Sequence, residues 1–112
     1  MFRLVCACLV LSLTYAVAKE PDIARGKQLV RLNGCHGCHT IPQMSDASGN
    51  IGPPLNGIGS RAYLSGVRTN STDMLIEWIR FPQQIVPGNA MPNMGISDGD
   101  ARDIAAFLDS LK

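Results

Sequence analysis

The sequence predicts an all-α fold in which three main helices are joined by long loops. Apolar residues recur at helical spacing in three segments, 22–33, 70–80 and 97–111. The segments between them are rich in proline and glycine, which disfavour regular structure. The sequence shows neither the apolar–polar alternation that is typical of strands nor an internal repeat. A length of 112 residues indicates one small domain.

The first 18 residues have the features of a secretory signal peptide. Arg3 precedes an apolar run over 4–17, and Ala16-Val17-Ala18 resembles a cleavage site. The run is shorter than the roughly 20 apolar residues that a membrane-spanning helix needs. We therefore expect an exported protein with a signal peptide over 1–18, one domain over 19–112 and no transmembrane segment after cleavage.

The charge of the chain is balanced once this leader is removed. Arg3 is the only charged residue of the leader, so nine basic and nine acidic residues are left. Nucleic-acid binding is typical of chains with a clear basic excess, and electrostatic steering needs an excess of one sign. The composition therefore argues against nucleic acid as a partner and against charge as the main docking force.

The first helix is expected over 22–33, with Asp22 as its cap and Val30 on its apolar face. Gly26 lies in its interior, where glycine costs about 1 kcal/mol relative to alanine. We interpret this glycine as a place where another helix crosses closely; the alternative is that it only makes the helix weak. Gly34 follows the helix, as a C-terminal glycine commonly does.

The second helix is expected over 70–80, with an apolar stripe that includes Trp78. Asn70 and Asp73 resemble a capping box at its start. Pro82 is expected to end the helix, because a proline pushes the preceding residue out of the helical region.

The last helix is expected over 97–111, with Ser97 as its cap and acidic residues in its early turns. The segments 40–60 and 82–95 are expected to be loops, and 61–66 is expected to form one short helical turn. Loops of about 20 residues are uncommon in compact domains. Such a loop is explained most simply if it wraps a bound group.

Cys35, Cys38 and His39 form a C-x-x-C-H motif, which is the attachment signature of c-type haem. Each thiol can add to one vinyl group of the haem, and the histidine is then held beneath the iron as an axial ligand. A zinc site would need a second ligand pair, but the other cysteines, Cys6 and Cys8, lie in the leader. A thioredoxin-like pair is found beside a βαβ pattern, and a structural disulfide does not require the histidine. We therefore predict one covalently attached haem c.

Methionine is the candidate for the second axial ligand, because the other histidine, His36, lies between the two cysteines. Met44 is too close to the motif along the chain, and Met74 is expected to pack or to face solvent. Met91 and Met94 are far enough away to cross the haem. Met91 is preferred because prolines and a glycine stiffen its loop. Two alternatives stay open: Met94 as the ligand, and both methionines as gap-filling residues.

Together these motifs resemble those of class I cytochromes c, the small soluble electron carriers. The resemblance covers about residues 22–111 and follows the order of the family: Gly26, C-x-x-C-H, Gly52-Pro53-x-Leu55, a methionine loop and Phe107. It implies the cytochrome c fold, with long loops wrapped around one haem c that is held by two thioethers. It also implies that the first and last helices cross near Gly26 and Phe107.

The resemblance implies roles for four further haem-site residues. The carbonyl group of Pro53 would accept a hydrogen bond from His39 and so fix its tautomer. Arg61 would lie near a haem propionate, and Asn89 would reach a propionate from the methionine loop. Trp78 would pack against the haem on the methionine side.

The function implied is one-electron transfer in a periplasmic respiratory chain, because bacteria attach haem c outside the cytoplasm. Electrons would pass through the thioether edge near Cys35 and Cys38. A periplasmic dehydrogenase or quinol-oxidising complex would be the donor, and a terminal oxidase or reductase the acceptor. The chain lacks the lysine ring of mitochondrial members, so their partners do not carry over.

The chain is expected to be an electron-transfer protein rather than an enzyme. One alternative is a haem enzyme or gas sensor with an open sixth position, although the chain has no distal histidine for peroxidase chemistry. Another alternative is the haem subunit of a larger oxidoreductase.

Overall fold

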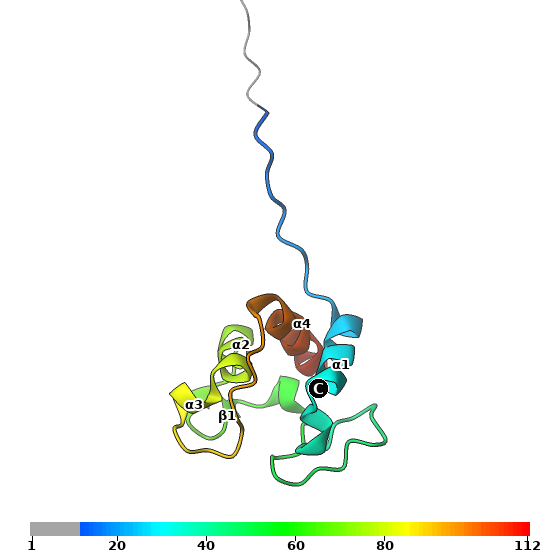
Figure 1. The fold of residues 1–112 in the computed structure, drawn as a ribbon, viewed down its shortest axis with the longest axis vertical. Coiled ribbons are helices and arrows are strands. Elements are labelled where there is room, and N and C mark those ends of the chain that lie inside the picture. Colours follow the sequence, from blue (N-terminus) through cyan, green and yellow to red (C-terminus); the bar gives the residue numbers. More distant parts are fainter. Residues whose placement is uncertain (1–11) are drawn as a thin grey trace, which may run out of the picture.

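The structure is a computed structural model that describes residues 12–112. Residues 12–21 run as an exposed, extended segment away from the globular part of the chain (Figure 1). The predicted signal peptide over 1–18 thus lies largely outside the described residues and stays a prediction. The regular elements, in chain order, are α1 (Ile23–Leu32), η1 (Cys35–Gly37), η2 (Ile58–Ser60), β1 (Tyr63–Leu64), β2 (Arg68–Thr69), α2 (Thr72–Arg80), α3 (Pro82–Ile85) and α4 (Asp98–Asp109).

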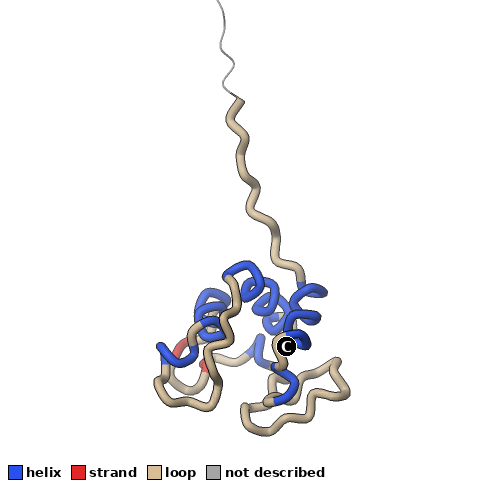
Figure 2. The backbone as a smooth tube through the Cα atoms, viewed as in Figure 1, coloured by secondary structure: helices blue, strands red, loops and turns tan. Residues whose placement is uncertain are grey.

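Helix α4 lies between α1 and α2 and contacts both of them (Figure 1). The loops that join these helices lie together on one side of the globule (Figure 2). The core between the helices is apolar, and the long loops contribute to it as well. Its most deeply buried apolar side chains belong to Val30, Leu75, Ala101, Ile104, Ala105 and Phe107. The predicted all-α architecture of three main helices with long loops is therefore confirmed.

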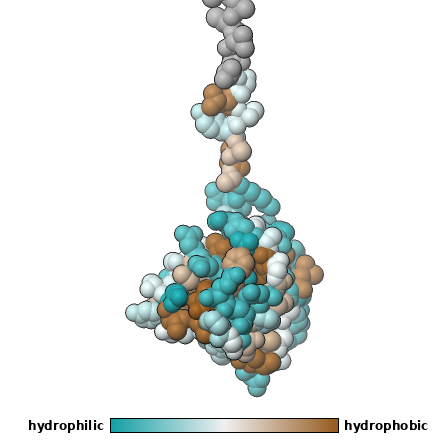
Figure 3. Space-filling model, turned by 60° about the vertical axis from the view of Figure 1, so that its left-hand side comes forward, coloured by the Kyte–Doolittle hydropathy of each residue, from teal (hydrophilic) through white to brown (hydrophobic). Residues whose placement is uncertain are grey.

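Figure 3 shows that polar and apolar residues are interspersed on the surface in view. Among the described residues of the globular part, large apolar side chains that stay exposed include Ile51, Tyr63, Val67 and Met94. Three of them, all but Val67, also line the main cavity.

The first and last helices cross at Gly26, as predicted. A Cβ atom on Gly26 would lie 1.9 Å from the carbonyl oxygen of Asp103 and 3.0 Å from the Cβ of Phe107. Only a glycine lets the two backbones approach this closely. Asp22 caps α1 by accepting a hydrogen bond from the backbone N–H of Arg25, which also agrees with the prediction.

The carboxylate of Asp103 ties the start of α1 to α4. It accepts hydrogen bonds from the backbone N–H of Asp22 at 2.8 Å and from the guanidinium of Arg25 at 2.6 Å. Arg25 also pairs with Asp100 at 2.6 Å. The backbone donor of Asp22, followed by the Arg25 guanidinium, lowers the pKa of Asp103 below its ordinary value.

This carboxylate makes the crossing sensitive to acid. Because the folded-state pKa of Asp103 is depressed, its contribution to stability is present above the unfolded value of about 3.9. It is lost as the pH falls through the lower, folded-state value. We expect Asp103→Asn to have a lower melting temperature than the wild type at neutral pH. The gap between the two melting temperatures should become smaller below about pH 4, where the wild-type carboxylate is lost as well. Glu77→Gln, which changes an exposed carboxylate of α2, is the control; an equal difference at every pH would contradict the prediction.

The predicted capping box of α2 is wrong. Ser71 is the cap, and its hydroxyl accepts a hydrogen bond from the backbone N–H of Met74 at 3.1 Å. The side chain of Asn70 instead donates to the carbonyl groups of Ile58 and Arg61, both at 2.9 Å. The amide of Asn70 was expected to cap the helix, but it is hydrogen-bonded to the preceding loop instead.

The segment 61–66 does not form the expected helical turn, and the expectation of a chain without strands is also wrong. Tyr63 pairs with Thr69 in a small antiparallel hairpin. The hairpin turns at Ser65 and Gly66, whose φ angles are 51° and 68°. Two successive residues with positive φ are typical of the tight turn that suits two twisted strands, which explains why the chain reverses here.

The methionine loop is more ordered than expected, because its first residues form the short helix α3. The backbone of Phe81 has left the helical region, with φ −135° and ψ 51°, as predicted for the residue before a proline. Pro82 then occupies the first position of α3, where its missing N–H is not needed. The segment 40–60 is a loop, as expected, except for η2 near its end.

Candidate haem site

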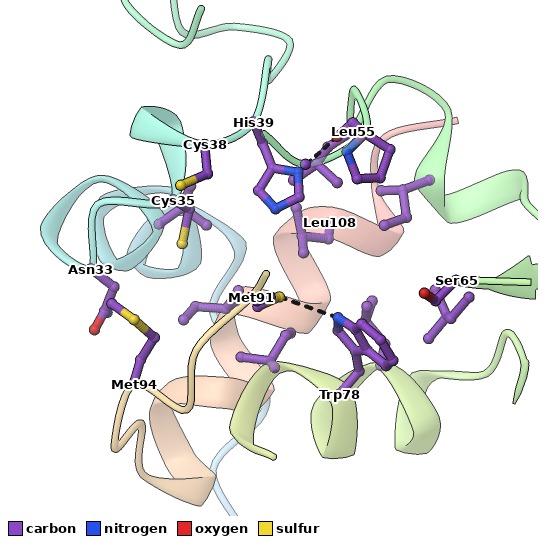
Figure 4. Close-up of a pocket in the computed structure, with 18 of the residues that line it drawn as sticks. Asn33, Cys35, Cys38, His39, Leu55, Ser65, Trp78, Met91, Met94 and Leu108 are labelled. Carbon is purple, nitrogen blue, oxygen red and sulfur yellow. Dashed lines mark hydrogen bonds between the residues drawn. The ribbon is translucent and has the colours of Figure 1, made fainter. Parts of the chain in front are cut away.

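A cavity of about 480 Å³ opens among the helices and loops. This volume lies within the range of about 300–1,000 Å³ that is typical of small-molecule sites. Its lining is mainly apolar and combines side chains from α1, α2 and α4 with residues of the two long loops. The two cysteines of the motif, His39, Trp78 and Met91 all line it (Figure 4).

The motif cysteines lie in and next to the tight turn η1. The backbone N–H groups of Cys38 and His39 both donate to the carbonyl group of Cys35, at 3.2 and 3.0 Å. This turn brings both thiols to one end of the cavity (Figure 4). Both cysteines are free, and burial raises the pKa of the Cys35 thiol.

His39 has one ring nitrogen occupied and the other available. Its Nδ1 lies 2.7 Å from the carbonyl oxygen of Pro53. A carbonyl oxygen can only accept, so this contact selects the tautomer of the neutral ring in which Nδ1 carries the proton and Nε2 keeps its lone pair. Gly52 makes room for this ring, because a Cβ there would lie 2.2 Å from the ring carbon Cε1. The hydrogen bond that the resemblance implied between His39 and Pro53 is thus present, whereas sequence reasoning missed the physical reason for Gly52.

Met91 enters the cavity from the opposite side to His39 (Figure 4). Its sulfur atom accepts a hydrogen bond from the indole N–H of Trp78 at 3.2 Å. Met94 also lines the cavity but is 44% exposed, and Figure 4 shows it beside Asn33, away from Trp78. The two methionines therefore differ in how deeply they reach into the site.

Arg61 and Asn89 line the cavity as well. The side chains of both residues form hydrogen bonds with backbone groups. The guanidinium of Arg61 donates to the carbonyl groups of Pro54 and Asn56. The amide of Asn89 donates to two carbonyl groups within the methionine loop and accepts from the backbone N–H of Met91 at 2.7 Å. Their contacts with haem propionates stay predictions.

Gln83 is the residue of this region that sequence reasoning missed. Its side chain makes hydrogen bonds to three residues of the methionine loop. No motif or spacing points to it, because its partners are backbone groups, which every residue has.

These residues fit a covalently held haem. Two thiols lie at one end of an apolar cavity, an imidazole nitrogen with a free lone pair lies on one side of it, and a thioether sulfur lies on the other. Imidazole and thioether are the ligand types of haem electron carriers. Among the lining residues within 12–112, Arg61 is the one charged side chain apart from the imidazole of His39, so this part of the lining also suits a large apolar ring. The fold and the site together define a haem protein of the c type.

Comparisons with known proteins agree with this class. The family model for cytochrome c matches residues 23–112. Cytochrome c2 of Blastochloris viridis is 31% identical over 122 aligned residues, which cover 96% of this chain and 92% of the relative. The chain belongs to the cytochrome c family, and the cytochrome c fold and the covalently bound haem c are confirmed with it. Membership in this family also implies electron transfer and redox partners in general.

The chain is also similar to parts of larger proteins. It is 35% identical over 89 residues to cytochrome c oxidase subunit 2 of Alkalihalophilus pseudofirmus, covering 79% of this chain but 25% of that protein. It is 28% identical over 103 residues to cytochrome c oxidase subunit 2 of Bacillus subtilis, covering 88% of this chain and 29% of the relative. The chain thus spans between a quarter and a third of each of these two relatives. Within residues 12–112, no helix has the length and apolar character needed to cross a membrane.

Proposed function

We propose that the protein is a one-electron carrier with a six-coordinate haem c, ligated by His39 and Met91. The observation that carries the proposal is that Nε2 of His39 and the sulfur of Met91 reach one cavity from opposite sides (Figure 4). Both groups are already oriented, the imidazole by Pro53 and the thioether by Trp78. A ligand pair held in place by neighbouring hydrogen bonds suits a site whose geometry changes little between two oxidation states.

The bound haem would supply the one-electron couple, and the side chains of the chain would hold and tune it. Cys35 and Cys38 would form the two thioethers, and Pro53 would keep the proton of His39 on Nδ1. The N–H of Trp78 points at the Met91 sulfur and would draw electron density from it. Arg61 would offset the charge of a propionate, and the apolar lining would keep water from the ring.

We place this carrier in a periplasmic respiratory chain, outside the cytoplasm. The donor would be a periplasmic dehydrogenase or a quinol-oxidising complex, and the acceptor a terminal oxidase or a reductase. The relatives named cytochrome c oxidase subunit 2 support an oxidase on the acceptor side. They also favour one second candidate, in which this chain works as the haem subunit of an oxidase. Gel filtration of the native protein separates the two, because a subunit elutes with a larger complex and a free carrier does not.

The oxidised and reduced holoprotein provides the test of the carrier function. We expect the weak red charge-transfer band of iron–methionine ligation in the oxidised form, and no carbon monoxide binding after reduction. A redox titration should follow a one-electron slope of about 59 mV per tenfold change in ratio. Absence of the band together with ready carbon monoxide binding would instead establish an open sixth position, as in a sensor or an enzyme.

A further inference from the structure

The loop that carries Met91 has little packing to hold it in place. Between Val86 and Gly95 every residue is partly or fully exposed, and the chain is buried again only at Ile96. Buried apolar contacts therefore cannot fix the position of the methionine by themselves. Hydrogen bonds must supply most of the constraint on this loop.

The side chain of Gln83 supplies three of these hydrogen bonds. Its Nε2 donates to the carbonyl groups of Asn89 at 2.7 Å and Met91 at 2.8 Å. Its Oε1 accepts from the backbone N–H of Gly88 at 2.9 Å. Both amide hydrogens and the amide oxygen are thus in use, and only one orientation of the amide satisfies all three partners.

Gln83 is itself well placed to act as a fixed point. It follows Pro82, which is one of the most deeply buried residues of the protein. Its backbone N–H donates to the side chain of Asn93 at 3.2 Å, beyond Met91 in the loop. Gln83 thus connects the part of the loop before the methionine with the part after it.

Together with Asn89, this glutamine holds the whole backbone of the methionine. The N–H of Met91 donates to Oδ1 of Asn89 at 2.7 Å, and the carbonyl group of Met91 accepts from Nε2 of Gln83. We propose that Gln83 is a positioning residue that keeps the Met91 sulfur in place and so resists its replacement by other ligands. This inference rests on the proposed role of Met91 as an axial ligand.

The consequence is measurable as ligand exchange. An added ligand such as imidazole can bind the iron only in molecules in which the methionine has moved away. Its apparent dissociation constant is therefore its intrinsic value divided by the fraction of such open molecules. A residue that holds Met91 makes this fraction small and imidazole binding weak.

The experiment is a titration of the oxidised holoprotein with imidazole, followed by the shift of the main haem absorption band, which every variant has. In the variants that keep Met91, loss of the iron–methionine band shows in addition that imidazole has replaced the methionine. In Gln83→Ala the carbonyl groups of Asn89 and Met91 lose their donor, and we expect imidazole to bind about tenfold more tightly. Gln83→Glu keeps the size of the side chain but replaces the donor with a carboxylate oxygen, which cannot donate to those carbonyl groups. It should therefore also bind imidazole about tenfold more tightly than the wild type. Gln84→Ala is the matched control, because Gln84 is the exposed neighbour in the same helix, and it should bind imidazole as the wild type does.

A double variant separates positioning from a general loss of structure. If Gln83 acts through the methionine, Gln83→Ala should add nothing to the tighter imidazole binding of Met91→Ala. Equal affinities in the wild type and both Gln83 variants, or an undiminished effect in the Met91→Ala background, would overturn the inference. If Met91→Ala itself leaves imidazole binding unchanged, the proposed ligand is wrong instead. If Gln83→Ala does not take up haem, the same test is made with Gln83→Glu, by comparing its imidazole affinity with that of the wild type and in the Met91→Ala background.

Discussion

Replacing Met91 with alanine is expected to abolish the iron–methionine band and to lower the reduction potential. A thioether sulfur favours the reduced iron, and His/Met ligation accordingly raises the potential. We expect a decrease on the order of 0.2 V, within the span of about 0.8 V that axial ligands set. The reduced variant should also bind carbon monoxide, because the sixth position is left open. Optical spectra and a redox titration measure all three effects.

Met94→Ala is the matched control for this experiment. Both methionines lie in the same loop and line the same cavity, but only Met91 receives the hydrogen bond from Trp78. We therefore expect Met94→Ala to keep the band and a potential close to that of the wild type. The opposite pattern, with the band lost in Met94→Ala and kept in Met91→Ala, would make Met94 the ligand.

The second large effect is expected for Gly26→Ala, at the crossing of α1 and α4. The new methyl group would lie 1.9 Å from the carbonyl oxygen of Asp103, a backbone atom that cannot move without shifting the helix. Alanine is the better helix former by about 1 kcal/mol, but the overlap should outweigh this gain. We expect a net loss of about 2–3 kcal/mol in the free energy of unfolding. The corresponding decrease in melting temperature is roughly 10–20 °C.

Gly99→Ala is the control for this substitution. Gly99 lies in the first turn of α4, and a Cβ there would have nothing within 4 Å. The same chemical change should therefore leave the melting temperature unchanged or raise it slightly. A similar loss in both variants would show that the close crossing is not the cause.

Much of the fold was predictable because its signals lie within a few residues of each other. Asp22 and Ser97 cap α1 and α4 as expected, and Gly34 follows α1 with a φ angle of 72°. Each of these signals depends only on one residue and on the backbone within a few positions of it: the two caps accept a nearby backbone N–H, and the glycine adopts a positive φ without strain. The crossing at Gly26 was also predictable, because a glycine inside a helix needs a reason from outside it.

The errors come from segments where two local signals competed or where the partner lies elsewhere in the chain. Asn70 and Ser71 are both good capping residues, and the choice between them depends on the loop carbonyl groups that bind Asn70. The hairpin at 63–69 was missed because strands of two residues are too short to show alternation.

The sequence by itself determined the class of the protein and the residues that would attach the haem. The spacing of Cys35, Cys38 and His39 is a chemical requirement that can be read without any structure. Only the tertiary structure decided how Met91, the proposed second ligand, is held. Met91 differs from Met94 through a hydrogen bond from Trp78 and through the amides of Gln83 and Asn89. Two of these three contacts are made to backbone groups, which are the same in every residue. Which backbone groups are bound therefore depends on the folded chain, and these contacts leave no pattern in the sequence.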